Sequence, residues 1–207
     1  MFKPLVSKLT GLILSIMVTH QVAVFSQNFK GGIVAGFNGS QVDGDTYAGY
    51  NKFGFMGGVF TYVSLNERSD VQLEIKYMGK GANKVTTESD PQRYTNQLNY
   101  IEIPVLYRFK TSKKFGFEGG LAFGYLFSYS IKNNYGKLAN DLLPDFKHFE
   151  LSWLLGLNYQ WSPKFSLNTR YSYSILPILD RQANSLYFRN RGSFNNLFSI
   201  GIYYTVR

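Results

Sequence analysis

Charged side chains occur at alternate positions inside several apolar stretches of this chain. Four of these side chains are acidic and four are basic, and all eight occupy even-numbered positions. They are Lys30, Glu74, Lys76, Glu102, Arg108, Glu118, Glu150 and Arg170. Carboxylates held close together can perform acid–base chemistry, whereas carboxylates that each have a neighbouring base form a structural salt-bridge network. Whether these side chains form a catalytic site or a salt-bridge network depends on the secondary structure that positions them.

The residues that alternate with these charges are apolar and recur at odd-numbered positions. In the stretch from Phe149 to Trp161 every odd position is apolar, and most of the even positions are small or polar. Successive side chains of a β-strand point to opposite faces, so this stretch predicts a strand with one apolar and one polar face. Large aromatic residues concentrate on the apolar face. This pattern is typical of a membrane β-barrel with lipid outside and a filled polar interior.

The alternation predicts eight strands, and only the last has its apolar residues on even positions. The approximate ranges are Phe29–Phe37, Phe53–Val63, Val71–Met78, Tyr100–Phe109, Phe115–Phe127, Phe149–Trp161, Phe165–Ile175 and Asn196–Val206. An even number of strands is what single-chain outer-membrane barrels require. The predicted fold class is therefore all-β, an eight-stranded antiparallel up-and-down transmembrane barrel.

The predicted connections between the strands alternate in length. The long ones are Asn38–Lys52, Gly79–Asn99, Ser128–His148 and Leu176–Asn195, and the short ones are Ser64–Asp70, Lys110–Lys114 and Ser162–Lys164. Outer-membrane barrels have short periplasmic turns and longer extracellular loops. A soluble β-sandwich has no reason to gather all its long loops at one end.

The N-terminal segment predicts export. Lys3 and Lys8 precede an apolar run from Leu9 to Phe25, and a small-residue cleavage pattern follows. We expect a signal peptide over residues 1–26 and a barrel domain over 27–207, since the run is too short for a retained membrane anchor. The chain has no Cys, which excludes disulfides and a lipid anchor on Cys. The predicted location is the outer membrane.

The remaining charge does not indicate a nucleic acid partner. Without Lys3 and Lys8, 20 of the 22 basic residues remain against 13 acidic ones, and they are scattered rather than aligned in a stripe. The expected partners are outer-membrane lipid and, in addition, envelope or secretion-complex proteins. The barrel is expected to be monomeric.

The inward charges are interpreted as a structural network in the lumen. An eight-stranded barrel is only wide enough inside for side chains to fill it, and buried charges must be paired. We expect Glu74 and Glu102 to share a base, and Arg108 to reach Glu118. Pro104 also points inward, and its missing N–H predicts a bulge in its strand.

Three further groups have the composition of a site. His148 with Asp141, Asp145 and Ser152 would suit an enzyme at the barrel rim, and Asp43-Gly44-Asp45 would suit calcium. Arg181, Arg189 and Arg191 would suit an anion such as phosphate. A solvated loop or turn explains each group more simply. No catalytic residue, cofactor or metal is therefore predicted.

Three segments in order resemble the PorT-like outer-membrane β-barrel domain family. They are the segments 31–38 (GGIVAGFN), 71–81 (VQLEIKYMGKG) and 100–106 (YIEIPVL). The resemblance covers nearly the whole mature chain and implies an eight-stranded outer-membrane barrel. It brings no catalytic residues, and its namesake branch is tied to a protein secretion and gliding machinery.

The leading hypothesis is a non-enzymatic integral outer-membrane barrel with a side-chain-filled lumen. It would act through its long extracellular loops or as a component of an envelope or secretion complex. Two alternatives stay open at this point: a rim enzyme acting on lipid or peptide, and a soluble periplasmic lipid-binding barrel.

Overall fold

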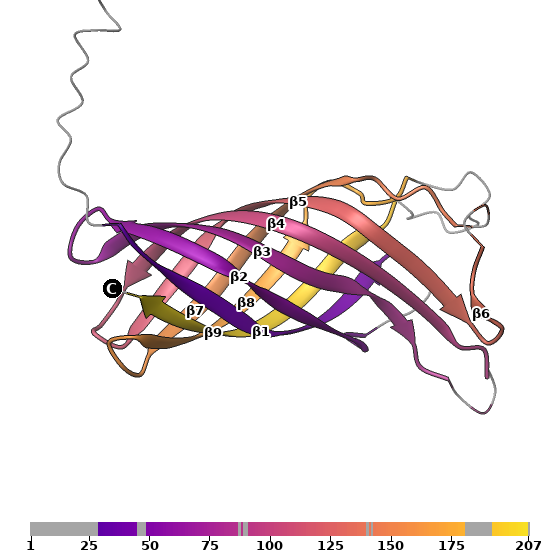
Figure 1. Ribbon diagram of the computed structural model, residues 1–207, viewed down its shortest axis with the longest axis horizontal. Helices are drawn as coiled ribbons and strands as arrows, with labels where there is room; N and C mark the ends of the chain where they lie inside the picture. The colour runs from indigo at the N-terminus through magenta and orange to yellow at the C-terminus, as the bar shows by residue number, and fades with distance from the viewer. Residues whose placement is uncertain are drawn as a thin grey trace, which may run out of the picture.

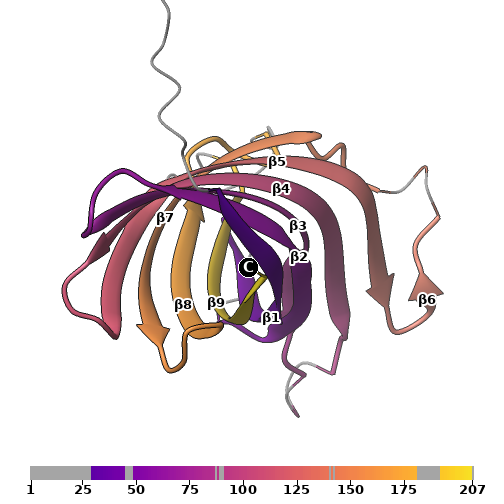
Figure 2. The same ribbon diagram turned by 60° about the vertical axis from the view of Figure 1, so that its left-hand side comes forward.

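The structure is a computed structural model that describes residues 29–44, 49–86, 88, 91–139, 141, 143–180 and 192–206. These residues form an antiparallel sheet that closes on itself (Figures 1 and 2). The predicted signal peptide, residues 1–26, lies outside the described residues.

Eight long strands and one short one make the sheet. They are β1 (Lys30–Asp43), β2 (Lys52–Ser64), β3 (Ser69–Lys84), β4 (Tyr94–Lys110), β5 (Phe115–Asn133), β6 (Gly136–Lys137), β7 (Phe149–Gln160), β8 (Phe165–Ser174) and β9 (Phe194–Val206). Each long strand pairs with the next long strand in the chain, β1 pairs with β9, and β6 pairs only with the end of β5. The predicted eight-stranded antiparallel barrel is confirmed.

The two faces of the wall follow the predicted alternation. On β7, Leu155 is 58% exposed, whereas Glu150 on the same strand is only 3% exposed. The change of phase in the last strand is also present, because Ile200 and Ile202 of β9 are exposed while Ser199 and Tyr203 are buried. The exposed apolar side chains therefore form the outer surface, and the charged ones face the lumen.

The short turns and both strand ends nearest the termini lie at one end of the barrel (Figure 1). Gly31 near the start of β1 pairs with Val206 at the end of β9. Aromatic rings pack in pairs at this end, with centroids 4.9 Å apart for Phe115 and Tyr159. Short turns and an interfacial aromatic girdle identify this end as periplasmic.

Four strands continue into segments predicted to be loops. β1 reaches Asp43, and β3, β4 and β5 reach Lys84, Tyr94 and Asn133. β3, β4 and β5 project beyond β7 and β8 at the end opposite the termini (Figures 1 and 2). We call residues 79–84, 94–99 and 128–133 the extension. The apolar alternation does not continue into these segments, because polar side chains take the outward positions beyond the acyl-chain region.

The bulge predicted at Pro104 lies elsewhere. Pro104 pairs in register with Ala122, and the β3–β4 ladder is merely interrupted opposite Pro104 without a shift. The register shift occurs where Asn99 pairs with Ser128 but Tyr100 pairs with Leu126, so Phe127 is the extra residue. A missing N–H removes one ladder bond, whereas a bulge requires an additional residue.

Candidate functional site: the lumen of the barrel

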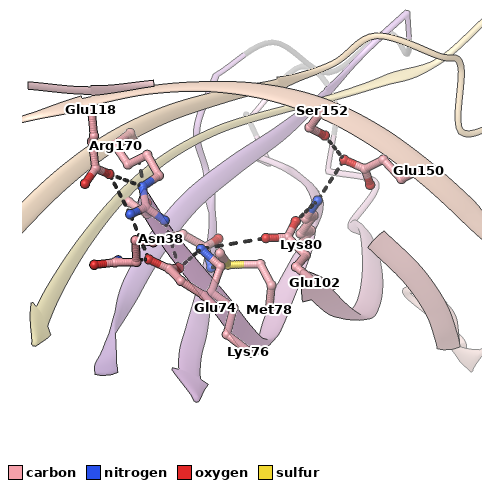
Figure 3. Close-up of polar contacts among 12 residues, drawn as sticks. Asn38, Glu74, Lys76, Met78, Lys80, Glu102, Glu118, Glu150, Ser152 and Arg170 are labelled. Carbon is pink, nitrogen blue, oxygen red and sulfur yellow. Dashed lines mark hydrogen bonds and ion pairs between the residues drawn. The ribbon is translucent and has the colours of Figure 1, made fainter. Parts of the chain in front are cut away.

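Arg170 on β8 lies at the centre of the first of two charge clusters in the lumen (Figure 3). Its Nε donates to Glu118 Oε1 at 2.6 Å, and its Nη1 donates to Glu74 Oε2 at 3.0 Å. The side chain of Arg170 reaches Glu74 across the barrel, from β8 to β3. Because Arg170 is only 2% exposed, these carboxylates neutralise it in place of water.

Lys80 on β3 lies at the centre of the second cluster (Figure 3). Its Nζ contacts Glu102 and lies 2.8 Å from Glu150 Oε1. Glu150 also accepts hydrogen bonds from the Ser152 hydroxyl at 2.6 Å and from the Asn195 amide at 2.7 Å. Five buried polar groups on four strands therefore satisfy one another.

Lys76 connects the two clusters. Its Nζ lies 3.5 Å from Glu74 Oε2 and 3.8 Å from Glu102 Oε2. Six of the eight predicted lumen charges are thus in one buried network: Glu74, Lys76, Glu102, Glu118, Glu150 and Arg170. A continuous set of ion pairs between opposite walls holds the strands in register and fills the space between them.

Two predicted members do not take part in this network. Lys30 is exposed at the periplasmic rim, because it is the first residue of β1 and lies at the open edge of the barrel. Arg108 was expected to reach Glu118, but its Nη2 donates to Asp70 Oδ2 at 2.9 Å. Asp70 is its direct partner on β3, and Glu118 is already bonded to Arg170.

Sequence reasoning missed Lys80, because the third strand was expected to end at Met78. The signal was present, since Glu74, Lys76, Met78 and Lys80 continue one even-numbered row. All four side chains are buried on one face of β3. Glycines at positions 79 and 81 obscured the alternation on the opposite face.

Apolar side chains cover the charge clusters at both ends of the lumen. At the extracellular end, Phe146 and Ile178 come from two different loops and pack in the same core as Leu98 and Leu197. The Lys147 N–H donates to the Ile178 carbonyl at 2.8 Å and ties the two loops together. At the periplasmic end the core continues with residues that include Phe60 and Tyr203, whose ring centroids are 5.2 Å apart.

β1 lies close to its neighbour strand and to the Phe60 ring at Gly32. A Cβ at Gly32 would overlap the carbonyl oxygen of Tyr204 and approach the ring of Phe60. Glycine lets β1 lie close to β9 at this position. Buried charged and apolar side chains occupy the interior along the described strands.

The other candidate groups are not assembled into sites. His148 stacks on Tyr125 of the outer face with centroids 5.7 Å apart, and its Nδ1 lies 2.9 Å from the Leu126 carbonyl oxygen. Ser152, in contrast, faces the lumen and donates to Glu150. Asp141 and Asp145 are exposed. The structure therefore places His148 and Ser152 on opposite faces of the wall.

Asp45 of the predicted calcium candidate lies outside the described residues. Asp43 accepts hydrogen bonds from the amides of Gln41 and Asn196. Within the described ranges, no group of three or more His, Asp or Glu side chains is arranged to hold a metal ion. Arg181, Arg189 and Arg191 lie outside the described residues.

Four buried polar atoms on the periplasmic side of Arg170 have no hydrogen-bond partner among the described residues. They are two acceptors and two donors: Gln72 Oε1, Glu118 Oε2, Arg108 Nε and Asn168 Nδ2. Arg108 and Glu118 are directly paired across β4 and β5. Buried polar atoms in native proteins are satisfied by protein or by ordered water.

We therefore expect ordered water at this level of the lumen. A high-resolution crystal structure should show at least one water within hydrogen-bond distance of Glu118 Oε2. Glu118→Leu should remove this water, whereas Thr169→Val on the outer face should leave it in place. Continuous empty space beside Glu118 Oε2, in a map that resolves water at the barrel ends, would contradict the expectation.

The closed ring, apolar exterior and filled polar lumen define a small outer-membrane β-barrel. The chain belongs to the outer membrane protein beta-barrel domain family, which matches residues 25–180. The predicted outer-membrane location is confirmed, and the soluble periplasmic alternative is wrong. Among the described residues, no helix is long and apolar enough to cross a membrane.

Similar solved structures include those of two bacterial proteins. One is Ail, the attachment invasion locus protein of Yersinia pestis, in complex with the heparin analogue sucrose octasulfate. It has 15% identity over 86% of this chain and 99% of that chain, with a TM-score of 0.52. The other is Neisserial surface protein A, with 14% identity over 85% and 96% of the two chains and a TM-score of 0.48. No curated protein matches the chain.

Proposed function

We propose that this protein is a non-enzymatic outer-membrane barrel that acts through its extracellular surface, above all through the extension. One observation carries the proposal: β3, β4 and β5 continue past the rest of the wall, while the lumen below is filled. At that height the strands are beyond the acyl-chain region, so they position side chains at the membrane surface and outside it.

The extension is a firm support rather than a loose loop. Its inner face packs against the loop residues at the extracellular end of the lumen, Phe146 and Ile178, which we call the cap. The rings of Tyr129 and Phe146 meet edge to face there at 5.2 Å. Leu98 and Ile131 are buried in the same core. At its outermost part, the turn between β5 and β6 carries Tyr135, which is 97% exposed. Exposed aromatic side chains on a rigid support are frequent anchors of protein interfaces.

We further propose that the protein belongs to the PorT-like branch and that the partner is a component of an envelope secretion complex. The support is the resemblance of the segments 31–38, 71–81 and 100–106 to that branch. Two of these segments lie in β3 and β4, whose ends form the extension.

The test combines a shortened connection between β5 and β7 with a crosslink at the same place. Replacing residues 134–142 with two glycines should leave the barrel folded and abolish capture of the partner. A deletion of the whole segment 128–148 would be a poor test, because it also removes Phe146 from the cap. A photo-crosslinking residue at Tyr135 should capture the same partner in the wild-type background.

The matched control places the same crosslinking residue at Lys113 in a periplasmic turn, where no partner should be captured. Gel mobility before and after boiling reports folding of every variant. If the shortened barrel is folded and still captures the partner in full, the extension is not the docking element and the proposal fails.

A further inference from the structure

The outer face of the extension is a regular grid of polar side chains. Asn99 pairs with Ser128, Gln97 with Ser130, and Thr95 with Lys132 across β4 and β5. Residues paired across adjacent strands point to the same face. Asn99, Gln97 and Thr95 continue the outward row of Ile101 and Ile103, so the whole grid faces outward.

The Phe127 bulge creates this surface. Below the bulge the even positions of β5 face inward, as Leu126 does, whereas above it Ile131 is buried. An extra residue reverses the alternation. Beyond the bulge, Ser128, Ser130 and Lys132 face outward, whereas Tyr129 and Ile131 face inward and pack in the apolar core with Phe146. The outer face therefore changes from apolar to polar at a single level.

That level is the outer edge of the lipid-facing belt. Tyr77, Tyr125 and Phe127 form the last aromatic row below the grid, with the rings of Tyr77 and Phe127 6.2 Å apart. The Tyr77 hydroxyl donates to Asn99 Oδ1 at 2.8 Å. Tyrosine rings with one wet end mark the membrane interface. The grid consequently stands at the height of the lipid headgroups.

The chemistry of the grid suits a sugar that carries phosphate. Asn99 Oδ1 already accepts hydrogen bonds from Tyr77 and, at 3.5 Å, from Gln97 Nε2. The Asn99 amide nitrogen and the Gln97 amide oxygen offer a donor and an acceptor, which hydroxyl-rich ligands require. Lys132 and Lys137 lie opposite each other on β5 and β6, and both are exposed. Two neighbouring ammonium groups match an anionic phosphate.

Two glycines form the β3 border of the grid. Gly79 and Gly81 pair with Asn99 and Gln97, and the Tyr77 ring is the side chain of that strand that contacts Asn99. Gly81 has φ +135°, and a Cβ there would overlap the Asn96 carbonyl oxygen. A side chain at this position would require the two strands to separate.

We propose that the outer face of the extension binds the phosphorylated sugar headgroup of an outer-leaflet glycolipid. The acyl chains lie against the aromatic row below, the sugar contacts Gln97 and Asn99, and phosphate contacts Lys132 and Lys137. Continuity with the lipid-facing belt selects a membrane lipid over a soluble ligand, because the grid begins where the acyl-chain surface ends.

The experiment uses the folded, full-length barrel in nanodiscs of phosphatidylcholine with lipid A as the minor component. Native mass spectrometry measures the lipid A retained per barrel. One variant combines Gln97→Ala with Asn99→Ala, and a second combines Lys132→Gln with Lys137→Gln. The matched control combines Lys113→Gln with Lys114→Gln in a periplasmic turn. Heat-dependent gel mobility confirms that each variant is folded.

Each lost lysine should lower retention of lipid A about fivefold, and each lost amide should lower it by about the same factor. The control should retain lipid A as the wild type does. Dephosphorylated lipid A should abolish the effect of the lysines and preserve that of the amides. Lys137→Gln alone lies outside the barrel ladder and gives a readout if a double variant does not fold.

Unchanged retention in both grid variants would overturn the proposal. An equal loss in the periplasmic control would overturn it as well, since the effect would then be general surface charge. Lipid A binding is measured without any protein partner, so its failure leaves the proposed capture at Tyr135 untouched.

Discussion

Replacing Arg170 with methionine should lower the free energy of unfolding by about 3–5 kcal/mol, because Glu74 and Glu118 would then remain buried without their shared base. Arg170 bonds to both carboxylates and is nearly inaccessible to water. Urea unfolding of the barrel in lipid vesicles, followed by tryptophan fluorescence, measures the change.

The control separates the lost base from the lost volume. A triple variant with Arg170→Met, Glu74→Gln and Glu118→Gln removes the two uncompensated charges as well and should recover most of the stability. If the single and triple variants are equally unstable, packing rather than charge pairing explains the loss. If the single variant is as stable as the wild type, the cluster is not part of the structural network.

Placing arginine at Leu155 should destabilise the barrel by about 2–4 kcal/mol, because this position faces lipid near the middle of β7. Leu155 is 58% exposed, and in a membrane that exposure is contact with acyl chains. The same unfolding experiment measures the effect, and assembly in cells should fall in parallel.

Leu65 provides the matched control, since it is 56% exposed but lies in the periplasmic turn between β2 and β3. Leu65→Arg should change the stability by less than about 0.5 kcal/mol, as is usual for solvated surface positions. Equal effects at Leu65 and Leu155 would mean that the outer face of β7 does not contact lipid.

β3 connects the ion-pair network of the lumen to the extension. The ion pairs from Arg170 and Lys80 join β3 to strands on other parts of the wall, which stabilises a narrow closed barrel. β3 is also one of the three strands that continue outward as the extension. The same strand therefore anchors the interior network and supports the extracellular surface.

The faces of the wall could be predicted from the sequence, because side-chain alternation along a strand is a local property with a period of two residues. Leu155 outside and Glu150 inside follow from position alone. The phase of the last strand was predictable for the same reason. Strand ends were harder to predict. Gln97 and Asn99 lie in a paired strand, but they are polar because they are beyond the acyl-chain region, so the apolar alternation stops before the strand does.

The partners of each charge depended on the tertiary structure. A shift of one strand by two residues keeps every side chain on its face and changes every contact across the lumen. Arg170 therefore meets Glu74 from the far wall, and Arg108 meets Asp70 rather than Glu118. The Phe127 bulge and the packing of Phe146 over the lumen likewise require the closed barrel, because each depends on neighbours that only the fold brings together.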